Sequence, residues 1–363
     1  MQLLKYELLK IFQQKSLYVI FLFLLVFATL IADFPNVDLL KKDVYHRWEG
    51  PLTTEKVQQA EKNYQVLSKG FNLENTAFTL TDLSKLGMYE EIAVLHSTES
   101  ANEKQISNIK NEHHYNSELQ INMLQKVDHL NYVYNYRGPQ QMIDFISFLS
   151  FLITGVMLLI GLSSIFSREY SSGVDHYILS TKKGRKALVW AKLGAALLYT
   201  LSVVSTLELY NFFITIIRIG NEGWKAPIQI LFDYHRSPYA FNLLEYHLIQ
   251  IGLHLLAAFG FALLILLISS VNKHALMSFF ISAGIFAFPY IREFTQVQWL
   301  KTLLSFSFPY VMKVKPLFVD FQTVNVYDYP VLLPIMAGII MLISSVIFIL
   351  MIFKVMEHKQ VTT

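Results

Sequence analysis

The chain has 363 residues, of which 53% are hydrophobic and only 16% are charged, and its net charge is +3. A soluble domain carries about 25% charged residues, so this composition excludes a disordered chain, a nucleic-acid binder with a basic face and a typical cytosolic enzyme. The chain contains no cysteine, which excludes disulfides, thiolate metal sites and cysteine nucleophiles. The mean hydropathy of +0.39 instead predicts a polytopic membrane protein.

Residues 1–16 predict an amphipathic helix on the cytoplasmic membrane surface, because Leu4, Leu8 and Ile11 share one helical face. Residues 17–32 are a run without a charged or strongly polar side chain and predict the first membrane span. A signal peptide is the alternative. The apolar run is slightly long for one and lacks an A-x-A cleavage pattern, which favours an uncleaved span.

Five further apolar runs approach or exceed the length of about 20 residues that a helix needs to cross a bilayer. They extend from about Met142 to Phe166, Ala187 to Ile217, Leu244 to Val271, Ala275 to Ile291, and Val331 to Phe353. The resulting fold class is an all-α polytopic membrane protein with six transmembrane helices, five of them within residues 142–353. Pro289 is expected to end the fifth span, which is the shortest of these five.

The distribution of Lys and Arg predicts the orientation. With the N-terminus inside, the short inner segments carry 11 Lys and Arg in 49 residues, and the short outer segments carry 6 in 64. The inner segments are 1–16, 167–186, 272–274 and the tail 354–363. We therefore expect a multi-pass protein of the cell membrane with both termini in the cytoplasm.

Residues 33–141 form a long insert of soluble composition between the first two spans, and they are expected outside the cell as a helical domain. Apolar spacing predicts a helix over residues 54–70 and a longer one over about 100–134. Gly138 and Pro139 are expected to break the second helix before the membrane. The absence of an N-x-[ST] glycosylation site anywhere in the chain favours a bacterial source.

The cytoplasmic loop 167–186 is basic, and by composition alone it merely anchors two helices. The order of its residues resembles the loop between the second and third spans of permease subunits of type-2 ABC exporters. The matching positions are Glu169, Gly173, Leu179, Arg185 and Lys192. The six-span plan and the large insert after the first span are similar to that family as well. One departure is the run 181–184, where such loops often carry a proline.

The resemblance implies that this loop docks on a separate cytoplasmic ATPase. Apolar docking contacts would come from Phe166, Tyr170, Tyr177, Ile178 and Leu179. Glu169 and Arg185 would fix the register through charge pairs, and the helix within residues 1–16 would be a second contact. The implied partners are two ABC ATPase subunits, a second permease copy, identical or related, and membrane lipid, without nucleic acid.

The sequence supports no catalytic or metal site of its own. No Gly-Lys dipeptide occurs in the 363 residues, so the P-loop of an ATPase is missing. The 11 histidines include no H-E-x-x-H pattern and no pair spaced i, i+4, and no G-x-S-x-G occurs. We expect no enzyme activity and no cofactor on this chain, with ATP and magnesium on the partner ATPase.

Glu208, His247 and His254 lie within the predicted third and fourth spans, and Glu208 and His254 fall at a similar depth. Charged groups are costly in hydrocarbon, so these residues are expected to pair or to face water. Two interpretations stay open: a polar patch on a substrate path, or a structural Glu–His pair or a wet outer vestibule.

The outer segment 292–330 is apolar and too short to cross the membrane twice. It predicts a re-entrant hairpin, an interfacial helix pair, or a loop that packs on the outer domain. The interpretation as a whole is a permease that exports an amphipathic or hydrophobic cargo, such as a peptide antibiotic or bacteriocin, a drug or a lipid. The alternatives are an ion-coupled secondary carrier and a ligand-sensing membrane protein that uses the outer domain.

Overall fold

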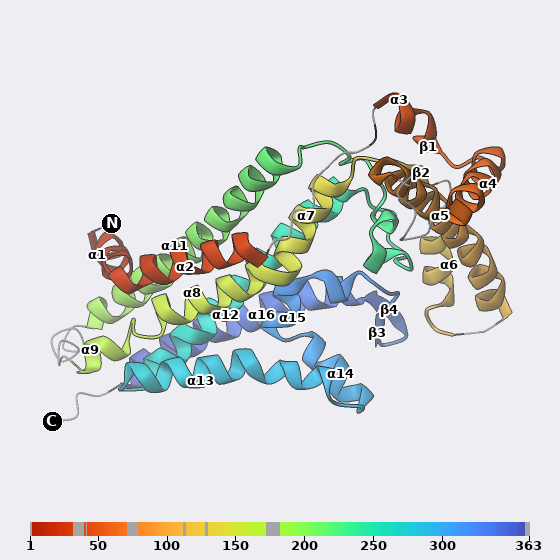
Figure 1. The fold of residues 1–363 in the computed structure, drawn as a ribbon. Helices are drawn as coiled ribbons and strands as arrows, with labels where there is room; N and C mark the ends of the chain where they lie inside the picture. The colour runs from red at the N-terminus through yellow and green to blue at the C-terminus, as the bar shows by residue number, and fades with distance from the viewer. Residues whose placement is uncertain are drawn as a thin grey trace.

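The computed structural model describes residues 2–31, 40, 42–70, 79–111, 114–127, 130–171 and 182–359. Figure 1 shows an elongated helical bundle, with a separate group of helices, α3 to α6, at one end and the short helices α1 and α9 at the other. We call these the insert end and the α9 end of the bundle.

The bundle is built almost entirely from long apolar helices, as the sequence predicts. Among the described residues, five helical runs are long and apolar enough to span a membrane. They are Arg137–Tyr170, Gly184–Arg218, Leu243–Val271, Ala275–Glu293 and Leu333–His358. The fold is therefore that of an all-α, multi-pass membrane protein.

The N-terminal region forms two helices, α1 (Gln2–Phe12) and α2 (Lys15–Ile31), which meet at a bend of 57°. Helix α2 has 17 residues and exposes Leu22, Phe23 and Leu30 on its outer face, as a lipid-facing helix would. A sixth crossing results only if α1 and α2 are taken together as one bent span.

The first of the five runs is interrupted by a π-helical turn. It consists of α7 (Arg137–Phe145), the π-helical segment η2 (Ile146–Ser150), α8 (Phe151–Leu162) and, after a turn, α9 (Ser167–Ser171). Helix α11 (Lys182–Arg218) packs closely against α8, where Gly161 leaves room for the ring of Tyr199. The Tyr199 hydroxyl donates a hydrogen bond of 2.8 Å to the carbonyl of Met157. Small residues thus allow the close helix contacts that are typical of membrane bundles.

Helix α12 (Leu243–Val271) is the centre of the bundle, since it contacts α7, α8, α11, α13, α15 and α16. It begins with a capping box, in which Glu245 N donates to Asn242 Oδ1 and Asn242 N donates to Glu245 Oε2. These reciprocal bonds satisfy backbone donors that a helix start otherwise leaves free. The remaining spans, α13 (Ala275–Ala287) and α16 (Leu333–His358), flank it.

Proline positions explain two differences from the predicted span boundaries. Helix α13 ends at Ala287 and continues as the 3-10 helix η5 (Phe288–Glu293), with Pro289 near its start. The last span begins at Leu333 rather than Val331, because Pro334 occupies its first turn and Val331 belongs to a strand. Proline is tolerated in the first turn of a helix, where no N–H donor is needed.

The insert consists of short elements around two longer antiparallel helices. They are α3 (Lys42–Tyr45), η1 (His46–Trp48), β1 (Gly50–Pro51), α4 (Thr54–Gly70), α5 (Leu80–Asn111), α6 (Ser117–Lys126) and β2 (Asn131–Tyr132). The prediction of one helix over residues 100–134 is wrong, because α5, α6 and β2 divide this stretch. Gly138 and Pro139 do not break a preceding helix but lie in the first turn of α7, so the insert ends at Tyr136 rather than at residue 141.

Aromatic contacts and one carboxylate hold the insert together. Trp48 meets Tyr89 edge-on at 5.1 Å between ring centroids. The hydroxyls of Tyr132 and Tyr136 each donate a 2.8 Å hydrogen bond to the Glu91 carboxylate. Burial raises the pKa of Glu91, and the two tyrosine hydrogen bonds offset part of this rise.

The long connections at the insert end contain two short 3-10 helices, two α-helices, a third 3-10 turn and a hairpin. They are η3 (Ile228–Ile230), η4 (Phe232–Tyr234), α14 (Gln298–Ser305), α15 (Phe308–Lys313), η6 (Lys315–Leu317), β3 (Thr323–Val326) and β4 (Tyr329–Leu332). Tyr327 and Asp328 form the hairpin turn with positive φ angles of 51° and 67°, as a type I′ turn requires.

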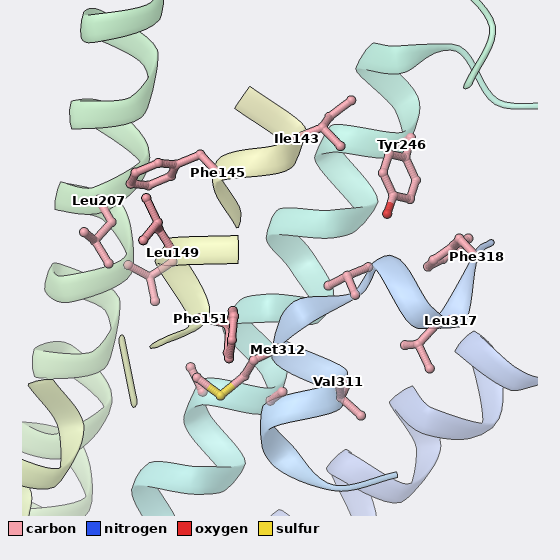
Figure 2. Packing of buried hydrophobic residues seen from close by; sticks show 14 of the residues in the cluster. Ile143, Phe145, Leu149, Phe151, Leu207, Tyr246, Val311, Met312, Leu317 and Phe318 are labelled. Carbon is pink, nitrogen blue, oxygen red and sulfur yellow. The ribbon is translucent and has the colours of Figure 1, made fainter. Parts of the chain in front are cut away.

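The segment 292–330 contains a helix pair and a hairpin that contacts the insert. Helices α14 and α15 form a pair, and Val311 and Met312 of α15 are buried against α12 and the π-helical region (Figure 2). The hairpin also contacts the insert, since Asn116 Nδ2 donates a 2.9 Å hydrogen bond to Thr323 Oγ1. The Tyr115 hydroxyl lies 2.9 Å from the same oxygen.

Candidate functional site

Four charged side chains form a buried group at the α9 end, which we call the charge cluster: Glu7, Lys10, Glu169 and Lys192. Lys192 is fully buried. Its Nζ donates to Glu7 Oε2 at 2.9 Å, to Glu169 Oε1 at 2.8 Å and to the Ile165 carbonyl at 3.0 Å. Three acceptors match the three protons of an ammonium group, so the buried cation is completely satisfied.

Lys10 completes the cluster from its open side. Its Nζ lies 2.8 Å from Glu7 Oε1 and 2.8 Å from Glu169 Oε1, and 51% of its side chain is exposed. Two carboxylates therefore face two ammonium groups, and the cluster is neutral as a unit. Such a group tolerates burial only while every member is present, since one unpaired charge in the interior is costly.

The cluster joins three elements that are distant in the sequence: α1, α9 and α11. Glu7 lies on the buried face of α1, between Leu4 and Ile11. It is a charged residue on an otherwise apolar face. Sequence reasoning missed Glu7. Its signal was a lone carboxylate on the apolar face of an amphipathic helix, where a partner of opposite charge is expected.

Backbone contacts fasten the neighbouring helix ends to the same region. Ser269 Oγ accepts from the backbone N–H groups of Phe166 and Ser167, at 3.1 and 3.3 Å, and donates to the Ser163 carbonyl at 2.8 Å. The Tyr170 hydroxyl donates to the Ser270 carbonyl at 3.2 Å. These bonds attach α9 and its preceding turn to the last turn of α12.

The first turns of α11 are attached to the last turn of α16. Arg185 Nη1 donates to the backbone carbonyls of Glu357 and Lys359, both at 3.2 Å. Lys186 Nζ lies 3.3 Å from the Glu357 carboxylate. The connection between α9 and α11 is thus tied to α12 through α9 and to α16 through the start of α11, and the Tyr170 hydroxyl also lies 3.4 Å from Met356 Sδ of α16.

The structure describes only part of the sequence-predicted site. Gly173, Tyr177, Ile178 and Leu179 lie outside the described residues. Phe166 is fully buried beneath Lys192, whose Nζ is 5.0 Å from the ring centroid, and Glu169 is nearly buried. Tyr170 is partly buried. Phe166 and Glu169 therefore face the interior of this chain, where they position the connection.

The intramembrane polar residues are not brought together as one pair. His254 is fully buried, with Nδ1 2.8 Å from the Met312 carbonyl and Nε2 3.2 Å from Thr154 Oγ1. A carbonyl only accepts, so Nδ1 carries the proton and Nε2 accepts from the threonine hydroxyl. Both ring nitrogens are thus occupied, and the expected Glu208–His254 pair does not form.

Glu208 and His247 each keep one buried polar atom, Oε1 and Nδ1, without a hydrogen-bond partner among the described residues. Glu208 is partly buried on α11, and the His247 ring lies 5.4 Å from the Trp224 ring between centroids. The three predicted residues therefore occupy different surroundings, and only His254 joins two elements, α8 and α15, through its ring.

Several polar side chains lie around the π-helical turn, and the sequence analysis did not identify them. Gln250 Nε2 donates to the Ile143 carbonyl at 3.0 Å and to Ser147 Oγ at 2.9 Å. Asn211 Nδ2 donates to the Met142 carbonyl at 3.0 Å. A π-helical turn frees backbone carbonyls from their usual partners. The isolated amides of α11 and α12 are a signal for such a turn.

The described part of the chain contains no group of three or more His, Asp or Glu side chains that is arranged to hold a metal ion. Comparison of the chain with family models, with curated proteins and with solved structures finds no match. The arrangement that remains for a functional argument is the charge cluster and the helix ends fastened around it.

Proposed function

We propose that this chain is the membrane-spanning permease subunit of an ATP-driven exporter of the ABC type. It crosses the cell membrane six times, with α1 and α2 forming the first crossing, and both termini and the α9 end lie in the cytoplasm. The insert is extracellular. The permease works as a dimer, with itself or with a related chain, and with two cytoplasmic ATPase subunits that carry ATP and magnesium.

The charge cluster is the observation that supports this proposal most. It ties the surface helix α1 to both sides of the connection between the second and third spans, through Glu169 on one side and Lys192 on the other. A partner that pushes on this connection would therefore move α1 and the inner ends of two spans together. A loop that only anchored two helices would need no such buried network.

The proposed mechanism is alternating access. Closure of the ATPase pair displaces the connection 167–186, and α9 and α11 transmit this movement along the second and third spans. Tyr177, Ile178 and Leu179 form the apolar contact with the ATPase, while Glu169 and Phe166 hold the base of the connection. The cargo is amphipathic or hydrophobic: a peptide antibiotic or bacteriocin, a drug or a lipid.

Co-purification tests the partner directly. The chain is expressed with the ABC ATPase encoded nearest to it, and the complex is isolated through a tag on the permease. We expect the ATPase to be retained, and we expect replacement of Tyr177 and Leu179 by Asp to release it. Leu303→Asp, at an exposed position far from the α9 end, is the matched control and should leave the complex intact.

A second measurement separates binding of the ATPase from transmission of its movement to the membrane spans. Glu169→Gln is expected to leave the ATPase bound but to lower cargo-stimulated ATP hydrolysis in vesicles about tenfold, because the cluster loses the charge that joins α9 to α11. Transport by the purified chain without an ATPase would contradict the proposal and favour an ion-coupled carrier. Ligand binding to the isolated chain, without any transport, would favour a sensor.

A further inference from the structure

The bundle contains a large apolar cavity at the insert end, remote from the charge cluster. It has a volume of about 670 Å³, within the range of about 300–1,000 Å³ that is typical of ligand sites. Helix α6 of the insert covers one side, and the first turns of α12 and α16 form the others. Its lining includes Met123, Phe241, Leu253, Ile335 and Gly338.

A smaller polar cavity of about 250 Å³ adjoins the apolar one. The two cavities share Lys126, Ala240 and Phe241 as lining residues. The polar cavity adds Lys225 and Glu245, and Lys126 and Lys225 are both exposed. With Glu245 counted as one negative charge, the two lysines give the lining of the polar cavity a net charge of +1.

Each cavity is lined by a buried side chain with an unpartnered polar atom. Tyr239 lines the apolar cavity, is 4% exposed, and its hydroxyl has no hydrogen-bond partner among the described residues. Gln229 lines the polar cavity and is fully buried. Its Nε2 donates to the carbonyls of Ser237 and Tyr239, while its Oε1 has no partner in the described part of the chain. Buried polar groups normally find partners, so the lining of each cavity contains a side chain whose hydrogen bonding is incomplete among the described residues.

We infer that these joined cavities bind an anionic membrane lipid from the leaflet on the insert side. An acyl chain fills the apolar cavity between α12 and α16, and the anionic head group lies in the polar cavity beside Lys126 and Lys225. The order of the two cavities, apolar between the helices and basic beyond their first turns, matches the order of tail and head group at a membrane surface. This inference requires only that the helices span a membrane, so it is independent of the proposed transport function.

The charge pattern favours a lipid over a second copy of the chain or a peptide. Lys126, which lines both cavities, and Lys225, which lines the polar one, complement one anionic head group beside a hydrocarbon chain. Each lysine near an anionic lipid contributes about 1 kcal/mol, which corresponds to about fivefold in affinity.

Photolabelling of the full-length protein tests the inference. The protein is reconstituted in phosphatidylcholine vesicles that contain a phosphatidylglycerol probe with a diazirine on its acyl chain. We expect labelled peptides to concentrate in residues 238–253 and 332–338. Unlabelled phosphatidylglycerol should reduce this labelling, and additional phosphatidylcholine should reduce it several-fold less. This competition uses the unmodified chain, so it does not depend on a variant that folds.

Gly338→Leu is the most direct test of the apolar cavity. A Cβ at Gly338 meets only a Leu253 methyl group, at 3.8 Å, so the added side chain has room and fills the apolar cavity. We expect labelling to fall about tenfold. Gly284→Leu is the matched control, because Gly284 is another helical glycine with nothing within 4 Å of an added Cβ, and it lies outside both cavities. Its labelling should equal that of the unmodified chain.

The double change of Lys126 and Lys225 to Gln tests the head-group site. We expect it to abolish the preference for phosphatidylglycerol over phosphatidylcholine while some tail labelling remains. Labelling spread evenly over all lipid-facing helices, or unchanged in Gly338→Leu, would overturn the inference. Crosslinks from this region to a second copy of the chain or to a peptide, in place of lipid, would overturn it as well.

Discussion

The two ends of the bundle differ in whether their buried polar groups have hydrogen-bond partners. At the α9 end, Lys192 is fully buried and all three of its protons have acceptors. At the insert end, Tyr239 and Gln229 keep polar atoms without partners among the described residues, beside two joined cavities. Buried polar atoms without partners among the described residues thus occur at the insert end, whereas the Lys192 ammonium group has all of its acceptors.

This contrast distinguishes a structural contact between helices from a binding site. The buried network fixes the relative position of α1, α9 and α11. Unpartnered buried polar atoms carry a cost of about 1–3 kcal/mol each. Substitutions at both ends of the bundle test this distinction.

Removal of the buried cation has the largest expected effect. Lys192→Met leaves Glu7 and Glu169 with one ammonium group instead of two, and we expect a loss of about 3–5 kcal/mol in the free energy of unfolding. Unfolding in mixed detergent micelles measures it. Lys354→Ala, an exposed lysine near the same end, should change little.

A second substitution shows whether the loss comes from the cluster. Adding Glu169→Gln to Lys192→Met removes one of the two carboxylates, so the remaining charges, Glu7 and Lys10, balance again. We expect the double variant to recover about 1–2 kcal/mol, within the range of coupling energies for residues in contact. Strictly additive losses would show that the four side chains do not act as a unit.

His254→Phe tests the contact of α12 with α8 and α15. The phenyl ring keeps the apolar volume but leaves the Met312 carbonyl and the Thr154 hydroxyl without partners. We expect a loss of about 1–3 kcal/mol, together with faster proteolysis between α14 and β3. His274→Phe, at an exposed position before α13, is the control and should have an effect of less than about 0.5 kcal/mol.

A matched pair of tyrosines compares a partnered hydroxyl with an unpartnered one. Tyr199→Phe removes a hydroxyl that donates to the Met157 carbonyl, and we expect a loss of about 1 kcal/mol. Tyr239→Phe removes a hydroxyl without a partner among the described residues, so the lipid-free protein should be unchanged or slightly more stable. The thermal unfolding midpoints of both variants decide this. Equal losses would remove the contrast between the two regions.

The smallest effect concerns the pH dependence of the insert. Burial raises the pKa of Glu91 above its ordinary value, so the folded insert binds this proton more tightly than the unfolded chain. Its contribution to stability is therefore full below the unfolded pKa of about 4.5 and is lost as the pH rises through the folded pKa. Melting curves followed by tyrosine fluorescence should show this decline, and Glu91→Gln should flatten it.

Hydropathy predicted the span positions to within a few residues, because the length of an apolar run is set by the thickness of the membrane. Apolar periodicity failed within residues 100–134, where α5 ends at Asn111 and α6 continues the same pattern after a turn. The hairpin β3–β4 was missed as well. Its turn residues, Tyr327 and Asp328, are neither glycine nor the Asn-Gly pair that typically signals such a turn.

The candidate site was half predictable. Glu169 and Lys192 were identified from the order of residues in one loop. The sequence alone does not show that this loop lies beside Glu7. The cavities at the insert end could not be predicted at all, because α6, α12 and α16 contribute to them from three separate parts of the chain. Isolated polar residues in apolar surroundings, such as Glu7 and Gln250, were the available signals.

The hydrogen bonds between the insert and the β3–β4 hairpin have a mechanical consequence. Asn116 and Tyr115 hold Thr323, and the hairpin runs directly into the first turn of α16. The insert is therefore attached to the last membrane helix as well as to its own flanking helices α2 and α7. A movement of the insert would therefore also move the start of α16, and α16 ends beside Arg185 at the α9 end of the bundle.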